Sequence, residues 1–165
     1  MDFTMISRVI DQMTLWYEGS PERITHFLKV YAYAKAIGEL EGLDDETRFI
    51  LETTAVLHDI GIKIAEEKYG SGAGPLQEKE GIPATREMLT SLGFPEKVVE
   101  RAAQLVGRHH TYTDVDGMDC QILLEADFLV NAEGGRRTMD AIRAMDEKVF
   151  RTAAGKKFLA RLYYA

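Results

Sequence analysis

Apolar residues recur at helical spacing along almost the whole chain, and no stretch alternates between apolar and polar residues as a surface strand would. The tripeptide Ser20-Pro21-Glu22 is typical of a helix start, because it combines an N-cap residue, a proline at the first helical position and an early acid. Gly42 and Gly93 are suitable stop signals. The sequence therefore predicts an all-α fold, and we find no internal repeat or linker that would divide it.

The pattern predicts a succession of amphipathic helices. They cover approximately residues 3–17, 20–42, 44–61, 83–93, 94–109 and 119–133, and two more follow the Gly134-Gly135 pair. Only the segment from Tyr69 to Pro75 has the composition of a loop, with three of the fourteen glycines. We expect this segment to form a mobile lid or the edge of a site.

Composition excludes several classes of protein. The 165 residues suffice for one domain, and the single cysteine, Cys120, excludes both an internal disulfide and a cysteine-based zinc site. The net charge of −7 would repel a nucleic acid polymer. No apolar run is long enough to cross a bilayer, and residues 1–5 do not resemble a signal peptide. We therefore expect a cytoplasmic protein without a nucleic acid or membrane partner.

Histidines and aspartates are the residues that carry chemical information. The four histidines, His26, His58, His109 and His110, each lie within or at the end of a predicted helix. His58 continues an apolar stripe and is followed at once by Asp59, while Asp127 lies on an apolar stripe of its own helix. A buried carboxylate costs several kcal/mol unless a cation accompanies it. Because imidazoles and carboxylates bind first-row divalent ions well, the pattern favours a metal site.

Each of these residues has a plainer interpretation when it is taken alone. A histidine that faces the core is often only a hydrogen-bonded core residue. The pair His109-His110 could place positive charge at a helix C-terminus. Asp127 could be a buried cap, or an ion-pair partner of Arg23 or Arg108. Taken together, however, these residues favour a shared metal ion over a separate structural role for each of them.

The order of these residues resembles that of the HD superfamily of metal-dependent phosphohydrolases. The resemblance rests on three strings: residues 53–61, which contain His58-Asp59-Ile60-Gly61; residues 106–110, which end in His109-His110; and residues 124–127, which end in Asp127. It covers approximately residues 20–135. It implies a compact all-α bundle in which residues 1–165 form a single domain, with helices of residues 136–165 packed on the core that bears the motifs.

The resemblance also implies a set of metal ligands. His26, His58, Asp59 and Asp127 would hold one ion, and Asp59 would reach a second ion that His109 and His110 also bind. The family's third histidine for that second ion lies four residues before a glycine, but here Gln77 lies four residues before Gly81. We therefore expect one firm site and a second that is weak, empty or differently ligated. The ion could be Mn, Fe, Ni, Co, Zn or Mg.

The activity that the resemblance implies is metal-dependent hydrolysis of a small phosphorylated metabolite, with a nucleotide as the leading candidate. Asp59, His109 and His110 would take part in catalysis, and Arg108 and Lys63 would contact the phosphate. Many family members carry the lysine directly after the glycine, where this chain has Ile62. The alternatives are a di-iron oxygenase of the same superfamily and a non-catalytic module that binds metal or nucleotide. Either a monomer or a homodimer is compatible with the sequence.

Overall fold

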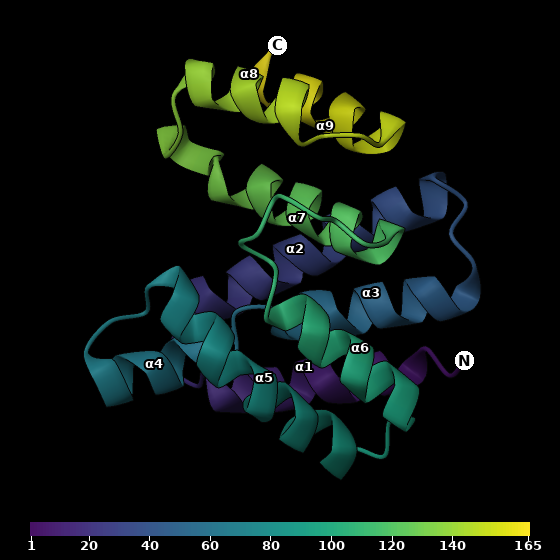
Figure 1. The fold of residues 1–165 in the computed structure, drawn as a ribbon, viewed down its shortest axis with the longest axis vertical. Helices are drawn as coiled ribbons and strands as arrows, with labels where there is room; N and C mark the ends of the chain where they lie inside the picture. The colour runs from purple at the N-terminus through teal and green to yellow at the C-terminus, as the bar shows by residue number, and fades with distance from the viewer.

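The computed structural model of residues 1–165 contains nine α-helices, one 3-10 turn and no β-strand, so the predicted all-α fold is confirmed (Figure 1). The elements are α1 (Thr4–Trp16), α2 (Pro21–Leu40), α3 (Asp45–Leu57), α4 (Gly61–Tyr69), α5 (Gly74–Ser91), α6 (Glu96–Val106), α7 (Met118–Asn131), the 3-10 turn η1 (Glu133–Gly135), α8 (Met139–Lys148) and α9 (Ala153–Tyr163). None of these helices combines the length and the apolar character that a membrane span requires.

Three helices form the centre of the bundle. Helix α2 packs against both α3 and α7, and α3 also contacts α7, α1 and α6. Helix α5 packs against both α4 and α6. Helices α8 and α9 lie beyond α7 at one end of the molecule (Figure 1). The buried side chains of Phe27, Leu51, Leu57 and Ile122 belong to the single apolar core between these helices. The segments that carry the predicted metal ligands therefore lie where the packing is most extensive.

Several helices begin at residues whose side chains bind the first free amide groups. The Asp44 carboxylate accepts a hydrogen bond from the Thr47 amide at 2.8 Å, which fixes the start of α3. Thr138 and Thr152 do the same for α8 and α9, since their hydroxyl groups accept from amides three residues later. The sequence thus encodes the starts of both C-terminal helices.

Several predicted boundaries are wrong. Helix α3 ends at Leu57 rather than near Gly61, and helix α4 was not predicted. Helix α5 begins at Gly74 rather than near Pro83, and Pro83 lies in its interior, where the missing amide hydrogen leaves the Lys79 carbonyl without its helical partner. Helix α6 ends at Val106, so His109 lies just beyond this helix rather than in it. Packing of α5 against both α4 and α6 offsets the cost of the proline, and no local sequence signal reports that packing.

Helices α4 and α5 approach most closely at two glycines. A side-chain carbon on Gly61 would lie 2.0 Å from the carbonyl oxygen of Gln77 and 2.5 Å from the amide nitrogen of Gly81. A side-chain carbon on Gly81 would lie 2.7 Å from Cγ1 of Val106. Because Gly61 follows Asp59 by two residues, the turn that carries the His-Asp pair rests directly on α5.

Candidate metal centre

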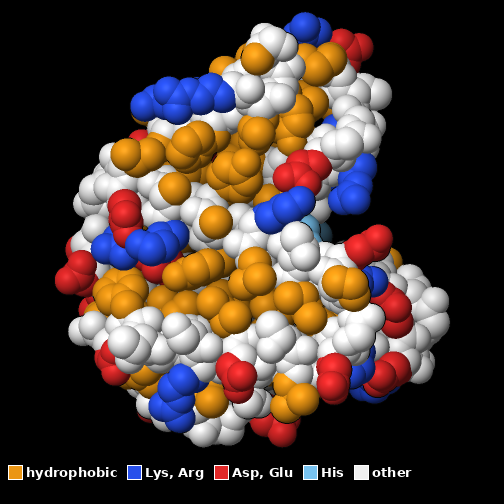
Figure 2. Space-filling view, turned by 180° about the vertical axis from the view of Figure 1, so that it is seen from behind, with side chains coloured by type: hydrophobic (Ala, Val, Ile, Leu, Met, Phe, Trp, Pro, Cys, Tyr) orange, Lys and Arg blue, Asp and Glu red, His pale blue; other side chains and the backbone are white.

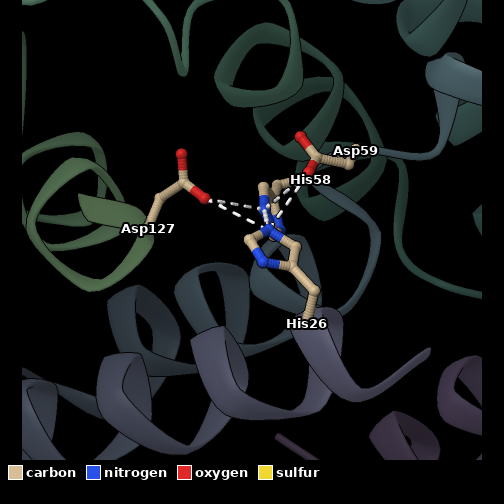
Figure 3. Close-up of side chains that lie close together, drawn as sticks. All are labelled: His26, His58, Asp59 and Asp127. Carbon is tan, nitrogen blue, oxygen red and sulfur yellow. Dashed lines mark hydrogen bonds and ion pairs between the residues drawn. The ribbon is translucent and has the colours of Figure 1, made fainter. Parts of the chain in front are cut away.

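Four predicted ligands meet at one point although they come from separate parts of the chain. His26 belongs to α2, His58 and Asp59 lie in the turn that follows α3, and Asp127 belongs to α7 (Figure 3). Their potential ligand atoms all lie within 4.8 Å of one another. Helix packing therefore brings together residues that are separated by up to a hundred positions, and it points them at a common centre.

The distances within this cluster are those that a divalent ion requires. The Nε2 atoms of His26 and His58 lie 3.1 Å apart, and Oδ1 of Asp127 lies 3.3 Å from the first and 3.1 Å from the second. Oδ2 of Asp59 lies 3.1 Å and 3.4 Å from the same two nitrogens. Ligand atoms about 2.1 Å from an ion are about 3.0 Å apart at right angles and about 3.4 Å apart at tetrahedral angles. The five distances therefore match the spacing of ligand atoms around a first-row divalent ion.

Backbone carbonyl groups orient the two most deeply buried imidazoles. Nδ1 of His58 lies 2.8 Å from the Ala55 carbonyl oxygen, and Nδ1 of His109 lies 2.8 Å from that of Val106. Because a carbonyl oxygen only accepts hydrogen bonds, Nδ1 of each ring must carry the proton. Nε2 of each ring then faces the carboxylates, with its lone pair available to an ion once any second proton leaves.

The charges of the cluster stabilise one another in the metal-free protein. Burial alone would lower the pKa of His58, but the Asp59 and Asp127 carboxylates outweigh burial and raise this pKa well above its ordinary value. Burial likewise opposes the charge on His26, yet hydrogen bonds to the same carboxylates raise its pKa. Burial would raise the pKa values of Asp59 and Asp127, but the histidines hold both well below the ordinary value. In the metal-free protein, the protons on His26 and His58 thus balance the carboxylate charge that a metal ion would otherwise balance.

This arrangement predicts that metal binding strengthens as pH rises. The raised pKa values mean that an ion must displace protons from His26 and His58. Its affinity should therefore fall about tenfold for each unit by which the pH is lowered and for each proton displaced. The same proton-bound pairing stabilises the metal-free fold below pH ~6.5 and is lost as pH rises through the raised pKa values. We expect thermal denaturation to show a larger rise in Tm on metal addition at pH 8.5 than at pH 6. An equal rise at both pH values would contradict this linkage.

A second cluster adjoins the first through Asp59. Oδ1 of Asp59 lies 2.9 Å from Nε2 of His109, while Oδ2 belongs to the first cluster, and the ligand atoms of Asp59, His109 and His110 lie within 4.8 Å of one another. Burial, with the neighbouring His109, lowers the pKa of His110 and favours its neutral form. Nε2 of His110 and Oε1 of Gln77 are both buried without a hydrogen-bond partner, which is unusual in a folded protein. The unpaired nitrogen of His110 fits a second, weaker ion, and the sequence predicts Gln77 as a further ligand of that ion.

Replacing Gln77 with histidine should therefore strengthen the second site. Gln77 is 7% exposed, and its backbone contacts the turn that follows Asp59. Imidazole binds first-row ions more tightly than a neutral amide oxygen does, and we expect a gain of about tenfold to a hundredfold in affinity for the second ion. Calorimetric titration with Mn²⁺ should show one tight ion in the wild-type protein and two in Gln77→His. One ion in both proteins would contradict this assignment.

The two predicted phosphate-binding residues bind other parts of the chain. The Arg108 guanidinium donates hydrogen bonds to the carbonyl groups of Thr113 and Asp114. Nζ of Lys63 donates to the Trp16 carbonyl at 2.9 Å and lies over the Trp16 ring. Neither side chain belongs to the metal cluster.

The carboxylate of Asp127 pairs with His26 and His58 rather than with an arginine. Arg23, one of the two arginine partners that the sequence left open, binds Glu66 instead at 2.6 Å. The Gly74 end of the glycine-rich segment contacts the His110 ring, since a side-chain carbon there would lie 3.4 Å from Cδ2 of His110. The segment thus borders the second cluster.

Sequence reasoning missed two residues that position the ligands. The Tyr17 hydroxyl donates to the Asp59 carbonyl at 3.2 Å and accepts from the Lys63 amide at 3.1 Å, and so it ties α1 to the turn after α3. Nothing in the local sequence around Tyr17 signals this contact. Glu125 is completely buried in α7, two residues before Asp127. Its place in an apolar stretch is the same signal that singled out Asp127, and it could have been recognised.

Glu125 accepts hydrogen bonds from four donors. These are the Gln121 side chain at 2.7 Å, the Thr152 hydroxyl at 2.6 Å, and the amides of Arg151 and Thr152 at 3.0 and 3.2 Å. Because the donors belong to α7 itself and to the start of α9, the carboxylate fastens the C-terminal helices to the helix that carries Asp127.

Comparisons with known proteins agree with this geometry. A search of curated proteins gives no significant match. A solved structure described as a predicted HD superfamily hydrolase, from an uncultured Thermotogales bacterium, superposes with a TM-score of 0.70 at 20% sequence identity. The alignment covers 96% of this chain and 84% of that chain, and it shows a shared fold. The family model for the HD domain matches residues 23–147, a range that includes both clusters. This chain therefore belongs to the HD domain family.

Proposed function

We propose that this protein is a metal-dependent phosphohydrolase that acts on a small phosphorylated metabolite, with nucleotides as the first substrates to test. The observation that carries the proposal is the spacing of the ligand atoms of His26, His58, Asp59 and Asp127, which suits one divalent ion. Membership in the HD domain family supports it, and so does the similar fold of a protein described as a predicted hydrolase. The acidic surface favours a small substrate over a polymer.

A divalent ion in such a site polarises a phosphoryl oxygen and lowers the pKa of a water molecule that it binds. The protein's own residues supply orientation and proton transfer. Asp59 reaches both clusters with its two oxygens, so that it fixes the position of His109 relative to the first cluster. When the second site is empty, the neutral His110 can accept a proton at Nε2, which has no partner in the protein.

The first test is a phosphatase screen of the protein loaded with Mn²⁺, Co²⁺ or Ni²⁺. The panel should contain nucleoside mono-, di- and triphosphates beside simpler phosphate esters, with release of phosphate as the measurement. An Asp127→Asn variant is the matched control, because it removes a ligand charge and keeps the shape of the side chain. Hydrolysis that requires the ion and disappears in the variant would support the proposal.

Other outcomes would favour the alternatives. Two iron ions per chain together with oxygen consumption would support a di-iron oxygenase. Tight nucleotide binding without any product would support a non-catalytic module. Full metal content without phosphate release from any compound in the panel would contradict the proposed hydrolase.

A further inference from the structure

A pocket of about 280 Å³ opens beside His26, outside the ring of ligand atoms. One wall is formed by the first turns of α2, with Thr25, His26 and Lys29, and the other by the end of α7 and the following segment, with Val130, Glu133 and Arg136. Figure 2 shows a notch in one edge of the molecule, with a histidine side chain at its inner end and both basic and acidic side chains around it. His26 therefore belongs both to the lining of this pocket and to the metal centre.

The charge available in this pocket comes from Arg136. Most arginines of this acidic protein pair with a carboxylate, as Arg23, Arg86 and Arg101 do. The Arg136 side chain is exposed and takes part in no ion pair or hydrogen bond. A guanidinium group offers parallel donors that match the oxygens of a phosphate, and here these donors are free.

The backbone holds Arg136 at this place. Gly134 and Gly135 have φ values of +66° and +74°, a conformation that side-chain-bearing residues rarely adopt. These two residues reverse the chain after α7, so that the segment carrying Arg136 turns back to face the first turns of α2. The turn thus places Arg136 among the residues that line the pocket.

Lys29 adds a second cation that is partly neutralised. Its Nζ lies 2.8 Å from Oε2 of Glu133, in a contact that joins α2 to η1. The exposed Glu22 carboxylate also lines the pocket, at the start of α2. An anion in the pocket could therefore bind the unpaired guanidinium of Arg136, and it would compete with Glu133 for Lys29.

We propose that this pocket binds a second phosphate group of the substrate through Arg136 and Lys29, while the metal centre holds the phosphoryl group that reacts. This inference rests on the proposed function and narrows it, because the substrate class becomes compounds that carry two neighbouring phosphates, such as nucleoside diphosphates. The volume is at the small end for a ligand site, and it leaves room for a phosphate group beside His26.

The test compares binding of inorganic pyrophosphate and inorganic phosphate by calorimetry, with Mg²⁺ in excess so that neither anion removes the bound ion. We expect the wild-type protein to bind pyrophosphate at least tenfold more tightly than phosphate. Arg136→Gln should lower pyrophosphate affinity about fivefold to tenfold and phosphate affinity less than twofold. Arg8→Gln, which removes another exposed and unpaired arginine on α1, should leave both affinities unchanged.

Glu133→Gln separates phosphate binding from a purely structural role. Removing this carboxylate frees Lys29 and should tighten pyrophosphate binding about twofold to fivefold, whereas a structural contact would give weaker binding. Equal losses for both anions in Arg136→Gln, or weaker binding in Glu133→Gln, would overturn the inference. These affinities do not depend on turnover. If Arg136→Gln loses the preference for pyrophosphate but the wild-type protein hydrolyses no substrate, the proposed function alone is refuted. If the wild-type protein hydrolyses a substrate but Arg136→Gln keeps the preference, this inference alone is refuted.

Discussion

A His58→Ala variant is expected to lose the metal ion and, with it, at least about a thousandfold of the hydrolytic rate, which corresponds to about 4 kcal/mol. His58 is completely buried, and its Nε2 atom lies 3.1–3.4 Å from ligand atoms of His26, Asp59 and Asp127. No neighbouring side chain can replace this nitrogen without repacking the core. Elemental analysis of the purified protein and phosphate release measured on the same sample would check the prediction.

This variant also leaves the Asp59 and Asp127 carboxylates with less compensating charge. Breaking a buried pair in this way typically costs about 3–5 kcal/mol, so we expect His58→Ala to be less stable for reasons unrelated to catalysis. Asp127→Asn avoids that ambiguity, because it removes one negative charge and keeps the volume of the side chain. A folded Asp127→Asn protein that retained both its full metal content and its rate would contradict the assigned ligand set.

A Gly61→Ala variant is expected to lose about 3 kcal/mol of unfolding free energy or to fail to fold. The added carbon would lie 2.0 Å from one backbone atom of α5 and 2.5 Å from another, and backbone atoms cannot rotate away as side chains can. Helices α4 and α5 would have to separate, and the turn that carries Asp59 would move with α4. Urea denaturation of the metal-free protein measures the loss.

Gly38→Ala is the matched control for Gly61→Ala. Gly38 also lies inside a helix, α2, but the nearest atom to its added carbon is a methyl group of Leu51 at 3.3 Å, on a side chain that can adjust. Alanine also favours the helix by about 1 kcal/mol relative to glycine, so the net change should remain within about 1 kcal/mol. A Gly61→Ala protein with the same denaturation midpoint as Gly38→Ala would show that the two helices are not held in contact.

Much of the candidate site could be predicted from the sequence, because its residues violate the local pattern. Asp127 within an apolar helix and His58 on an apolar stripe are costly placements, and periodicity alone exposes such conflicts. The structure brings both residues together with His26 and Asp59. Their roles as ligands remain predictions until a metal ion is measured.

The surroundings of the site could not be predicted in the same way. The start of α5 depends on how closely Gly61 and Gly81 pack, and that distance has no local signal in the sequence. Likewise, the sequence predicts a phosphate contact for Arg108 from its position beside the ligands and for Lys63 from the family resemblance. The two side chains instead bind carbonyl groups of a loop and of α1. Arg136 lies at the pocket beside His26 through a reversal of the chain, and it was not predicted at all.

The buried carboxylate of Glu125 has a consequence for the order in which the protein takes shape on the ribosome. Three of its four donors belong to residues 151 and 152, which are synthesised some 25 residues after it. Until they emerge, α7 cannot pack fully without burying an unpaired charge, a cost of several kcal/mol. The nascent chain should therefore hold α2 and α3 together before Asp127 reaches its final position. Metal capture would then be among the last events of biogenesis, after the C-terminal helices have docked.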